Sequence, residues 1–305
     1  MQGAARADGS ETDRAAVFIL RDAEEKGLLR PGGEVVEGTA GNTGIGLAMV
    51  CAAKGYRCKI FMPNTQSREK VAALRAYGAD VEEVPPAPYT DPLNFNHRAR
   101  DYARGRSNCV WTDQFDNRAN RYGHFQSTGP EIYAQTDGRL DAFTCATGTG
   151  GTLAGVGMYL KQRSAAIRIV LADPPGSVLY EAITTGCVPA TRSGSSITEG
   201  IGQGRVTANL EGAPIDEAIR VSDEESLRAT FDLLAEEGLF VGCSSGLNVA
   251  AAVRVARKLG PGKTVATILC DSGQRYQSRL LSRSWLESKG LLHVLEPKHL
   301  RLLEK

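Results

Sequence analysis

The sequence lacks an excess of charge of either sign, because 36 lysines and arginines are balanced by 35 aspartates and glutamates in 305 residues. No long run of one sign occurs. Proteins that bind nucleic acid or anionic membranes use clustered positive charge to neutralise phosphate, so neither is an expected partner. Apolar runs are also short, and none reaches the roughly 18 residues typical of a membrane-spanning helix.

Metal-binding and disulfide patterns are missing as well. The seven cysteines are an odd number without a CxxC spacing, and the four histidines are scattered. We therefore predict free thiols in the core, and neither a disulfide framework nor a zinc site. The first fourteen residues contain three acidic side chains and no apolar core, which excludes a secretory signal and indicates a cytoplasmic protein.

Glycine is the residue in excess. The chain has 34 glycines in 305 residues, against a usual share of about 7%. Many of them gather in four short stretches, so their purpose is local. These stretches cover residues 38–46, 148–157, 200–204 and 242–246.

Short β-rich segments alternate with helical ones, which predicts an α/β fold with mainly parallel sheets covered by helices. The length suits about two domains. We place a boundary near residues 117–120, giving a smaller domain over 1–118 and a larger one over 119–305. Strands are expected over 33–37, 56–63, 80–84, 141–145, 168–172 and 264–270, helices over 42–54, 67–77, 153–163, 223–238 and 247–258, and a loop over 242–246.

Two of the glycine stretches lie between a strand and a helix. Backbone N–H groups of the GTGGT stretch, residues 148–152, can converge on a phosphate at the start of the following helix. The stretch matches neither GxxxxGK[ST] nor GxGxxG, and a tight turn alone would also explain it. The TAGNTG stretch, residues 39–44, offers hydroxyls, an amide and exposed N–H groups to a small carboxylate.

One motif favours a different enzyme class. Residues 242–246 fit GxSxG around Ser244, and Asp271 and His293 follow in the order of an α/β-hydrolase triad. A serine hydrolase therefore stays a remote alternative, because the partners follow Ser244 too closely and no oxyanion segment of the HGGG type is present.

TAGNTG, GTGGT, EGIGQG and GCSSG occur in this order, together with DQFDN at 113–117 and CDSGQRY at 270–276. From about Gly9 to about Lys289 the chain resembles the cysteine synthase (O-acetylserine sulfhydrylase) family of fold-type II pyridoxal-phosphate enzymes. The resemblance implies two three-layer α/β/α domains, as in the tryptophan synthase β subunit, with the cofactor between them. It also implies a homodimer. The details are similar to the cysteine-synthase-like and cysteine-desulfhydrase branch.

The resemblance also implies roles for individual residues. Asn42 would bind the 3′ oxygen of the pyridoxal ring, and Ser272 would face the ring nitrogen. A hydroxyl there leaves that nitrogen largely unprotonated, which suits loss of a group from a β-carbon. The cofactor phosphate would lie on Gly148, Thr149, Gly150, Gly151 and Thr152, and the substrate carboxylate on Thr39, Ala40, Gly41, Thr43 and Gln114.

One position departs from the family pattern where the chemistry depends on it. The family places its Schiff-base lysine in a GSxKDR-like segment, and here Thr12 occupies that position with the spacing to Asn42 intact. Threonine cannot form an imine and is a poor base. We therefore expect pyridoxal phosphate to bind non-covalently at best, and activity to be impaired. A non-catalytic paralogue that binds an amino acid or the C-terminal peptide of a partner enzyme is the alternative.

The family's opening segment is also missing ahead of Gly9, which predicts an exposed sheet edge. Either the reading frame begins further upstream and restores the lysine region, or the chain is a pseudoenzyme. The altered residues adjoin the missing segment, which favours the first explanation. In that case the true N-terminus could direct the protein to mitochondria.

Overall fold

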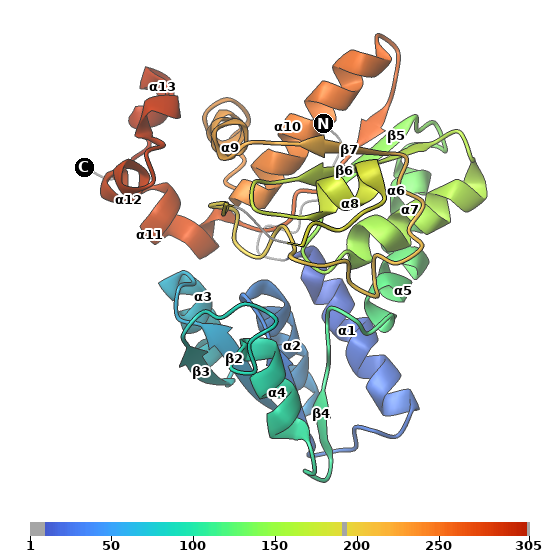
Figure 1. Ribbon diagram of the computed structural model, residues 1–305, viewed down its shortest axis with the longest axis vertical. Coiled ribbons are helices and arrows are strands. Elements are labelled where there is room, and N and C mark those ends of the chain that lie inside the picture. The colour runs from blue at the N-terminus through green and yellow to red at the C-terminus, as the bar shows by residue number, and fades with distance from the viewer. Residues whose placement is uncertain (1–9, 191–193, 304–305) are drawn as a thin grey trace.

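Two parallel β-sheets organise the computed structural model, which describes residues 10–190 and 194–303 (Figure 1). The strand orders are β3-β2-β1-β4 and β7-β6-β5-β8, and every pair of neighbouring strands in them is parallel. The predicted α/β class is confirmed. The strands are β1 (Glu34–Gly38), β2 (Arg57–Pro63), β3 (Asp80–Val84), β4 (Cys109–Trp111), β5 (Ala142–Ala146), β6 (Arg168–Asp173), β7 (Glu217–Arg220) and β8 (Val265–Ala266).

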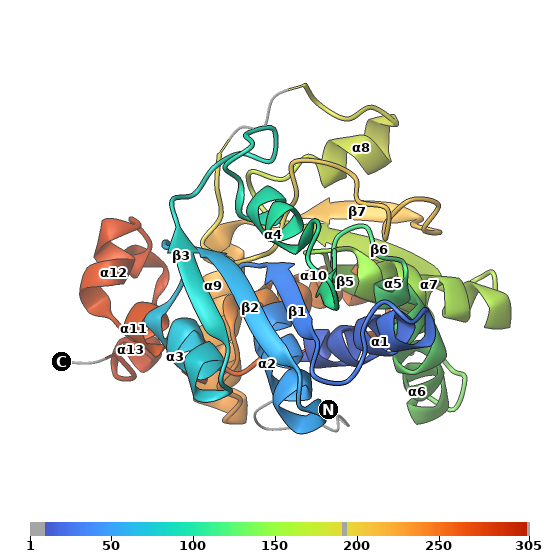
Figure 2. The same ribbon diagram turned by 90° about the horizontal axis from the view of Figure 1, so that it is seen from below.

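Helices follow the strands and cover the sheets (Figure 2). Two short 3₁₀ helices, Gly273–Tyr276 and Leu292–Val294, lie near the C-terminus. The α-helices are α1 (Glu11–Glu25), α2 (Asn42–Lys54), α3 (Arg68–Ala76), α4 (Phe95–Ala103), α5 (Ala119–Gln126), α6 (Thr128–Gln135), α7 (Gly151–Arg163), α8 (Leu179–Thr185), α9 (Asp223–Glu237), α10 (Cys243–Leu259), α11 (Gln277–Leu280), α12 (Arg283–Ser288) and α13 (Pro297–Leu300).

The first sheet is buried on both faces. Successive side chains of a strand point to opposite faces, and in β1 both Val35 and Val36 are fully buried. Val35 packs in a cluster with residues of α1, α2 and α3, whereas Val36 packs with Ala99 of α4. Helices on both faces make this unit a three-layer α/β/α sandwich, as predicted.

The second sheet is also buried on both faces. In β5, Phe143 packs with α7 and α8 on one face, and Ala142 packs with α10 on the other. Both side chains are fully buried. A third apolar cluster joins α9 to the C-terminal helices, which lie beside it in Figure 1.

The two units are tied together by segments far apart in sequence. The Ser67 hydroxyl at the start of α3 donates to the carbonyl of Arg275, at 2.6 Å. The N–H of Ser278 donates to Glu69, also at 2.6 Å. The predicted division between residues 118 and 119 falls at the start of α5 and stays a prediction.

Two boundaries differ from the sequence prediction by more than two residues. Residues 243–246 form the first turn of α10 and not a loop, with Gly242 as the N-cap. The strand expected over 264–270 ends at Ala266. Beyond it, side chains of α10 bind the backbone in place of a strand: Ser245 accepts from the N–H of Cys270, and Asn248 donates to the carbonyl of Ile268, each at 2.8 Å.

The region around the predicted sheet edge is only partly described. Gly9, where the family resemblance begins, lies outside the described residues. The exposed edge expected from a missing opening segment stays a prediction.

Candidate functional site

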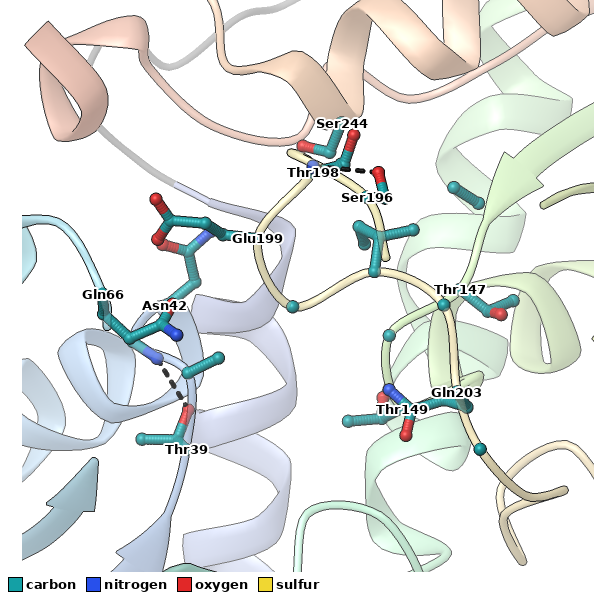
Figure 3. Close-up of a pocket in the computed structure, with 18 of the residues that line it drawn as sticks. Thr39, Asn42, Gln66, Thr147, Thr149, Ser196, Thr198, Glu199, Gln203 and Ser244 are labelled. Carbon is teal, nitrogen blue, oxygen red and sulfur yellow. Dashed lines mark hydrogen bonds between the residues drawn. The ribbon is translucent and has the colours of Figure 1, made fainter. Parts of the chain in front are cut away.

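A cavity of about 1160 Å³ is lined from both sheets, where loops at the carboxyl ends of β1 and β5 meet. Ligands of open parallel α/β sheets bind at this end of the strands. In Figure 3, Thr39 and Asn42 lie on one side of the cavity and Thr147 and Thr149 on the other, with Glu199 on the loop between them. The cavity therefore gathers both of the glycine stretches predicted to bind anionic groups.

The GTGGT stretch forms a cup at the start of α7. Gly150 caps the helix in the left-handed region (φ 87°), which favours glycine. A Cβ at Gly148 would lie 2.7 Å from the carbonyl oxygen of Gly200. Gly151 is not among the lining residues, and a Cβ there would collide with Asn120. The other four predicted residues, Gly148, Thr149, Gly150 and Thr152, line the cavity beside a helix N-terminus that attracts anions.

The second stretch carries the chain from β1 into α2. The Thr39 hydroxyl accepts from the N–H of Gly41 at 3.1 Å, and Gly41 has a φ of 133°. Gln114 donates to the carbonyl of Gly38 at 2.8 Å and so lies beside this turn. All of the residues predicted to bind a carboxylate line the cavity: Thr39, Ala40, Gly41, Thr43 and Gln114.

Asn42, the first residue of α2, is held from the opposite unit. Its amide nitrogen donates to Asp271 at 2.6 Å, and its amide oxygen accepts from Arg275 at 3.0 Å. The same Asp271 oxygen accepts from the Tyr276 hydroxyl, also at 2.6 Å. Both Asn42 groups are therefore oriented before a ligand arrives.

Thr12 lies in the cavity wall, in the first turn of α1. Ser10 caps this helix and forms a capping box with Asp13. The Thr12 hydroxyl donates to the Ser10 hydroxyl at 2.9 Å. The structure thus places the residue at the family's lysine position in the cavity with the phosphate cup, but as part of a helix cap.

Glu11, which the sequence analysis did not single out, also lines the cavity. Its N–H donates to the carbonyl of Cys270 at 3.3 Å, and the Ser10 hydroxyl donates to its carboxyl at 3.2 Å. Burial, together with the neighbouring Asp271 carboxylate, raises the pKa of Glu11 to about 8. In the sequence, the sign that Glu11 belongs to the site was that this acidic residue directly precedes Thr12.

The raised pKa makes the stability of the fold depend on pH. The folded protein holds the Glu11 proton up to about pH 8, whereas an unfolded glutamate releases it near its ordinary pKa of 4.5. Stability is therefore lost as the pH rises between these values. We expect Glu11→Gln to be more stable than the native chain at pH 8 by roughly 2–4 kcal/mol and equal to it near pH 4, by urea unfolding.

The matched control is Glu25→Gln, which changes an exposed glutamate in the last turn of the same helix. In this control, the change in stability between pH 4 and pH 8 should be the same as in the native chain. Equal stabilities of Glu11→Gln and the native chain at pH 8 would contradict the prediction.

The ring-nitrogen role of Ser272 stays a prediction. Its hydroxyl accepts from the N–H of Gln274 at 3.2 Å and caps a 3₁₀ helix, and it is not among the described residues that line the cavity. Ser244, in the first turn of α10, does line it.

The triad of Ser244, Asp271 and His293 expected for a serine hydrolase is not formed. The Asp271 carboxylate accepts from Asn42 and Tyr276, and His293 is exposed on a 3₁₀ helix. Without a histidine between them, Ser244 and Asp271 lack the base that activates a serine nucleophile. We expect no labelling of Ser244 by a fluorophosphonate probe.

A buried ion pair closes the cavity between the two units. Lys70 of α3 is 1% exposed, and its ammonium lies 2.8 Å from the carboxylate of Glu199 in the EGIGQG loop. Arg279 binds the other Glu199 oxygen at 2.5 Å. All three side chains line the cavity. The partners are too far apart in sequence for any spacing rule to have found them.

Most of the cysteines are buried, as predicted. All seven cysteines are free, and five of them are buried. In the part of the chain that the structure describes, no cluster of three metal-ligating side chains occurs. None of the helices in these residues is long and apolar enough to cross a membrane.

Comparison with known proteins gives one consistent result. Residues 7–271 match the family described as pyridoxal-phosphate dependent enzyme. Cysteine synthase 1 of Emericella nidulans is 58% identical, covering 96% of this chain and 80% of that protein. Cysteine synthase 1 of Neurospora crassa is 57% identical, covering 96% and 78%. The crystal structure of O-ureido-L-serine synthase is 36% identical with a TM-score of 0.80, covering 88% and 82%. The chain therefore belongs to the pyridoxal-phosphate-dependent enzymes, as a cysteine synthase-like member.

Proposed function

We propose that the cavity holds pyridoxal phosphate without a covalent bond, beside a small amino acid whose carboxylate lies on residues 39–43. The donor set fits the cofactor phosphate, because the cup combines backbone N–H groups, two threonine hydroxyls and the start of α7. Two glycines of the cup let neighbouring segments pack closely against it, since a Cβ at Gly148 would meet the carbonyl of Gly200 and one at Gly151 would meet Asn120.

The chain's own residues would orient the bound molecules. When bound, the cofactor draws electrons from the α-carbon of the amino acid, which eases loss of the α-proton and of a β-substituent. Asn42 is fixed by Asp271 and Arg275 and faces the 3′ oxygen in this proposal. Ser272 stays our proposal for the residue that faces the ring nitrogen, and Ser244, which lines the cavity, is the alternative.

The proposed loss of activity rests on Thr12, which lies at the family's lysine position. The family reaction is β-replacement on O-acetylserine by sulfide, or β-elimination from cysteine, and both begin with removal of the α-proton. The Thr12 hydroxyl is engaged with Ser10 and is a poor base near neutral pH. We therefore propose that this chain binds the reactants but carries out both reactions slowly.

Titration calorimetry tests the proposal. Pyridoxal phosphate should bind the purified chain, and pyridoxal, which lacks the phosphate, should bind at least about tenfold more weakly. Borohydride should leave the protein mass unchanged, since no imine joins the cofactor to the chain. No binding of pyridoxal phosphate, or a reduced cofactor attached to the native protein, would refute the proposal.

A non-catalytic binding role is the second candidate. The EGIGQG loop approaches residues 39–43 closely, since a Cβ at Gly200 would lie 3.6 Å from that of Ala40. Such a loop pair can enclose the carboxylate of an amino acid or of a partner enzyme's C-terminal peptide. Calorimetry with serine, cysteine and C-terminal peptides distinguishes them, and binding of none would leave this role without support.

The assembly and the compartment are proposals that rest on the family resemblance. We infer a homodimer, which sedimentation velocity would show, and a cytoplasmic location. A relative in Saccharomyces cerevisiae, 42% identical over 93% of this chain and 77% of its own length, is named a putative mitochondrial cysteine synthase. Fluorescence microscopy of a C-terminal fusion decides between the compartments.

A further inference from the structure

His124 lies beneath the phosphate cup and has no role in the proposal above. It belongs to α5, is 1% exposed, and lines the cavity. Helices α5 and α7 lie side by side (Figure 1). A Cβ at Gly155 would lie 2.8 Å from the His124 Cβ, so the close approach of the two helices requires glycine there. The imidazole is thus held in a fixed place against the first turn of α7.

Both ring nitrogens of His124 face a hydroxyl. Nδ1 lies 2.9 Å from the hydroxyl oxygen of Thr128, and Nε2 lies 3.3 Å from that of Thr152. Thr152 is the last residue of the cup and itself lines the cavity. A chain of hydrogen bonds therefore leads from α6 through the imidazole to the anion site.

The imidazole is neutral at physiological pH. Burial, and secondarily the positive charge of Arg14, lower the pKa of His124 to about 3. Arg14 of α1 is itself paired with Glu131 of α6 at 2.7 Å, and Thr128 and Thr152 are the uncharged groups that contact the ring. A neutral ring carries one N–H and one lone pair, so its two hydroxyl contacts must have opposite directions.

We propose, on the basis of the function proposed above, that His124 is a positioning residue that makes the Thr152 hydroxyl a donor to the cofactor phosphate. With the proton on Nε2, the ring donates to the Thr152 oxygen and leaves the hydroxyl proton free for the anion. Nδ1 then accepts from Thr128. With the proton on Nδ1, Thr152 would donate to the ring and present only lone pairs to the phosphate.

Binding of an anion and the tautomer are therefore linked. An anion in the cup stabilises the Nε2–H form, because only that form lets Thr152 donate toward it. Conversely, the ring in that form prepares the hydroxyl before the anion binds, which lowers the entropy lost on binding. The contribution should be that of one hydrogen bond to a charged group.

Two substitutions of His124 test the roles of its two ring nitrogens separately. Gln places its amide nitrogen near the position of Nε2, whereas Asn places its amide near Nδ1. We expect His124→Asn to weaken binding of pyridoxal phosphate about tenfold, and His124→Gln to retain affinity close to the native value. Thr152→Val should weaken binding similarly, and adding His124→Asn to it should produce no further loss.

Binding of pyridoxal serves as the matched control, because it lacks the phosphate and should be unchanged in every variant. Nitrogen-15 NMR of the native protein gives an independent readout. We expect the Nε2–H tautomer with inorganic phosphate bound, and no titration of His124 between pH 5 and 8.

Several results would overturn the inference. Among them are unchanged affinity of a folded His124→Asn variant, an additive loss in the double variant, and an Nδ1–H tautomer in the phosphate-bound protein. If the native chain binds neither pyridoxal phosphate nor inorganic phosphate, the proposed function fails together with the inference. Loss of affinity in His124→Gln equal to that in His124→Asn would reduce His124 to a packing residue, which also refutes it.

Discussion

Thr12→Lys is expected to convert reversible binding of pyridoxal phosphate into covalent attachment. The new amine would enter the wall of the cavity that holds the phosphate cup, and would form an imine with the cofactor aldehyde, with release of water. It would also supply the missing base at the α-carbon, which alone is typically worth about 10²–10⁴-fold in rate. Visible absorption, borohydride trapping with mass spectrometry, and the rate of elimination from cysteine measure the change.

Thr12→Ala is the matched control, since it removes the hydroxyl without adding an amine. It should gain neither absorption nor rate. A peptide map after borohydride reduction is essential, because Lys70 and Lys289 also line the cavity. Cofactor attached to either lysine in the native chain would contradict the assignment of Thr12 as the position that decides covalent binding.

Much of the fold was accessible from the sequence, because local signals agreed with the tertiary structure. The helix predicted over residues 42–54 has the same bounds as α2, since Gly41 precedes it and Gly55 ends it in the left-handed region. In contrast, GCSSG has the composition of a loop. It becomes the first turn of α10 because Ser245 binds the backbone of Cys270, 25 residues later, and no local pattern encodes that contact.

The residues of the site also fall into those that local sequence predicts and those that depend on distant contacts. Residues of the two strand-to-helix stretches were predicted because each stretch is continuous, so a motif fixes their positions relative to one another. The role of Ser272 rests on resemblance alone and stays a prediction, whereas Ser244, which the sequence suggested only as a nucleophile, lines the cavity. Glu11, Lys70 and Glu199 were not predicted. Their importance comes from burial and from contacts between units, which a single sequence does not display.

Glu199→Gln is expected to lower the free energy of unfolding by about 3–5 kcal/mol. The substitution removes the charge that compensates Lys70, whose ammonium is withdrawn from water and lies 4.5 Å from the ring centre of Tyr276. Breaking a buried pair by changing one partner costs this much, because the remaining charge stays buried. Urea unfolding monitored by circular dichroism gives the difference from the shift in midpoint.

The double variant Lys70→Met with Glu199→Gln separates charge from packing. It removes both charges while keeping an unbranched side chain against Gly41, whose missing Cβ leaves room for the Lys70 stem. We expect it to recover most of the lost stability, since no uncompensated charge is left at position 70 and the amide that replaces the Glu199 carboxylate can still accept from Arg279. An equal loss in the single and double variants would show that shape, and not charge compensation, is what the pair supplies.

An exposed ion pair provides the scale for comparison. Arg118 and Glu211 lie 3.1 Å apart with side chains 61% and 58% exposed, so Glu211→Gln should change stability by less than about 1 kcal/mol.

Glu199→Gln should also weaken binding of serine in the presence of pyridoxal phosphate, because the EGIGQG loop that carries Glu199 lines the cavity opposite residues 39–43. Weaker ligand binding without loss of stability would place Glu199 in ligand recognition alone, against the interpretation that its pair with Lys70 holds the two units together.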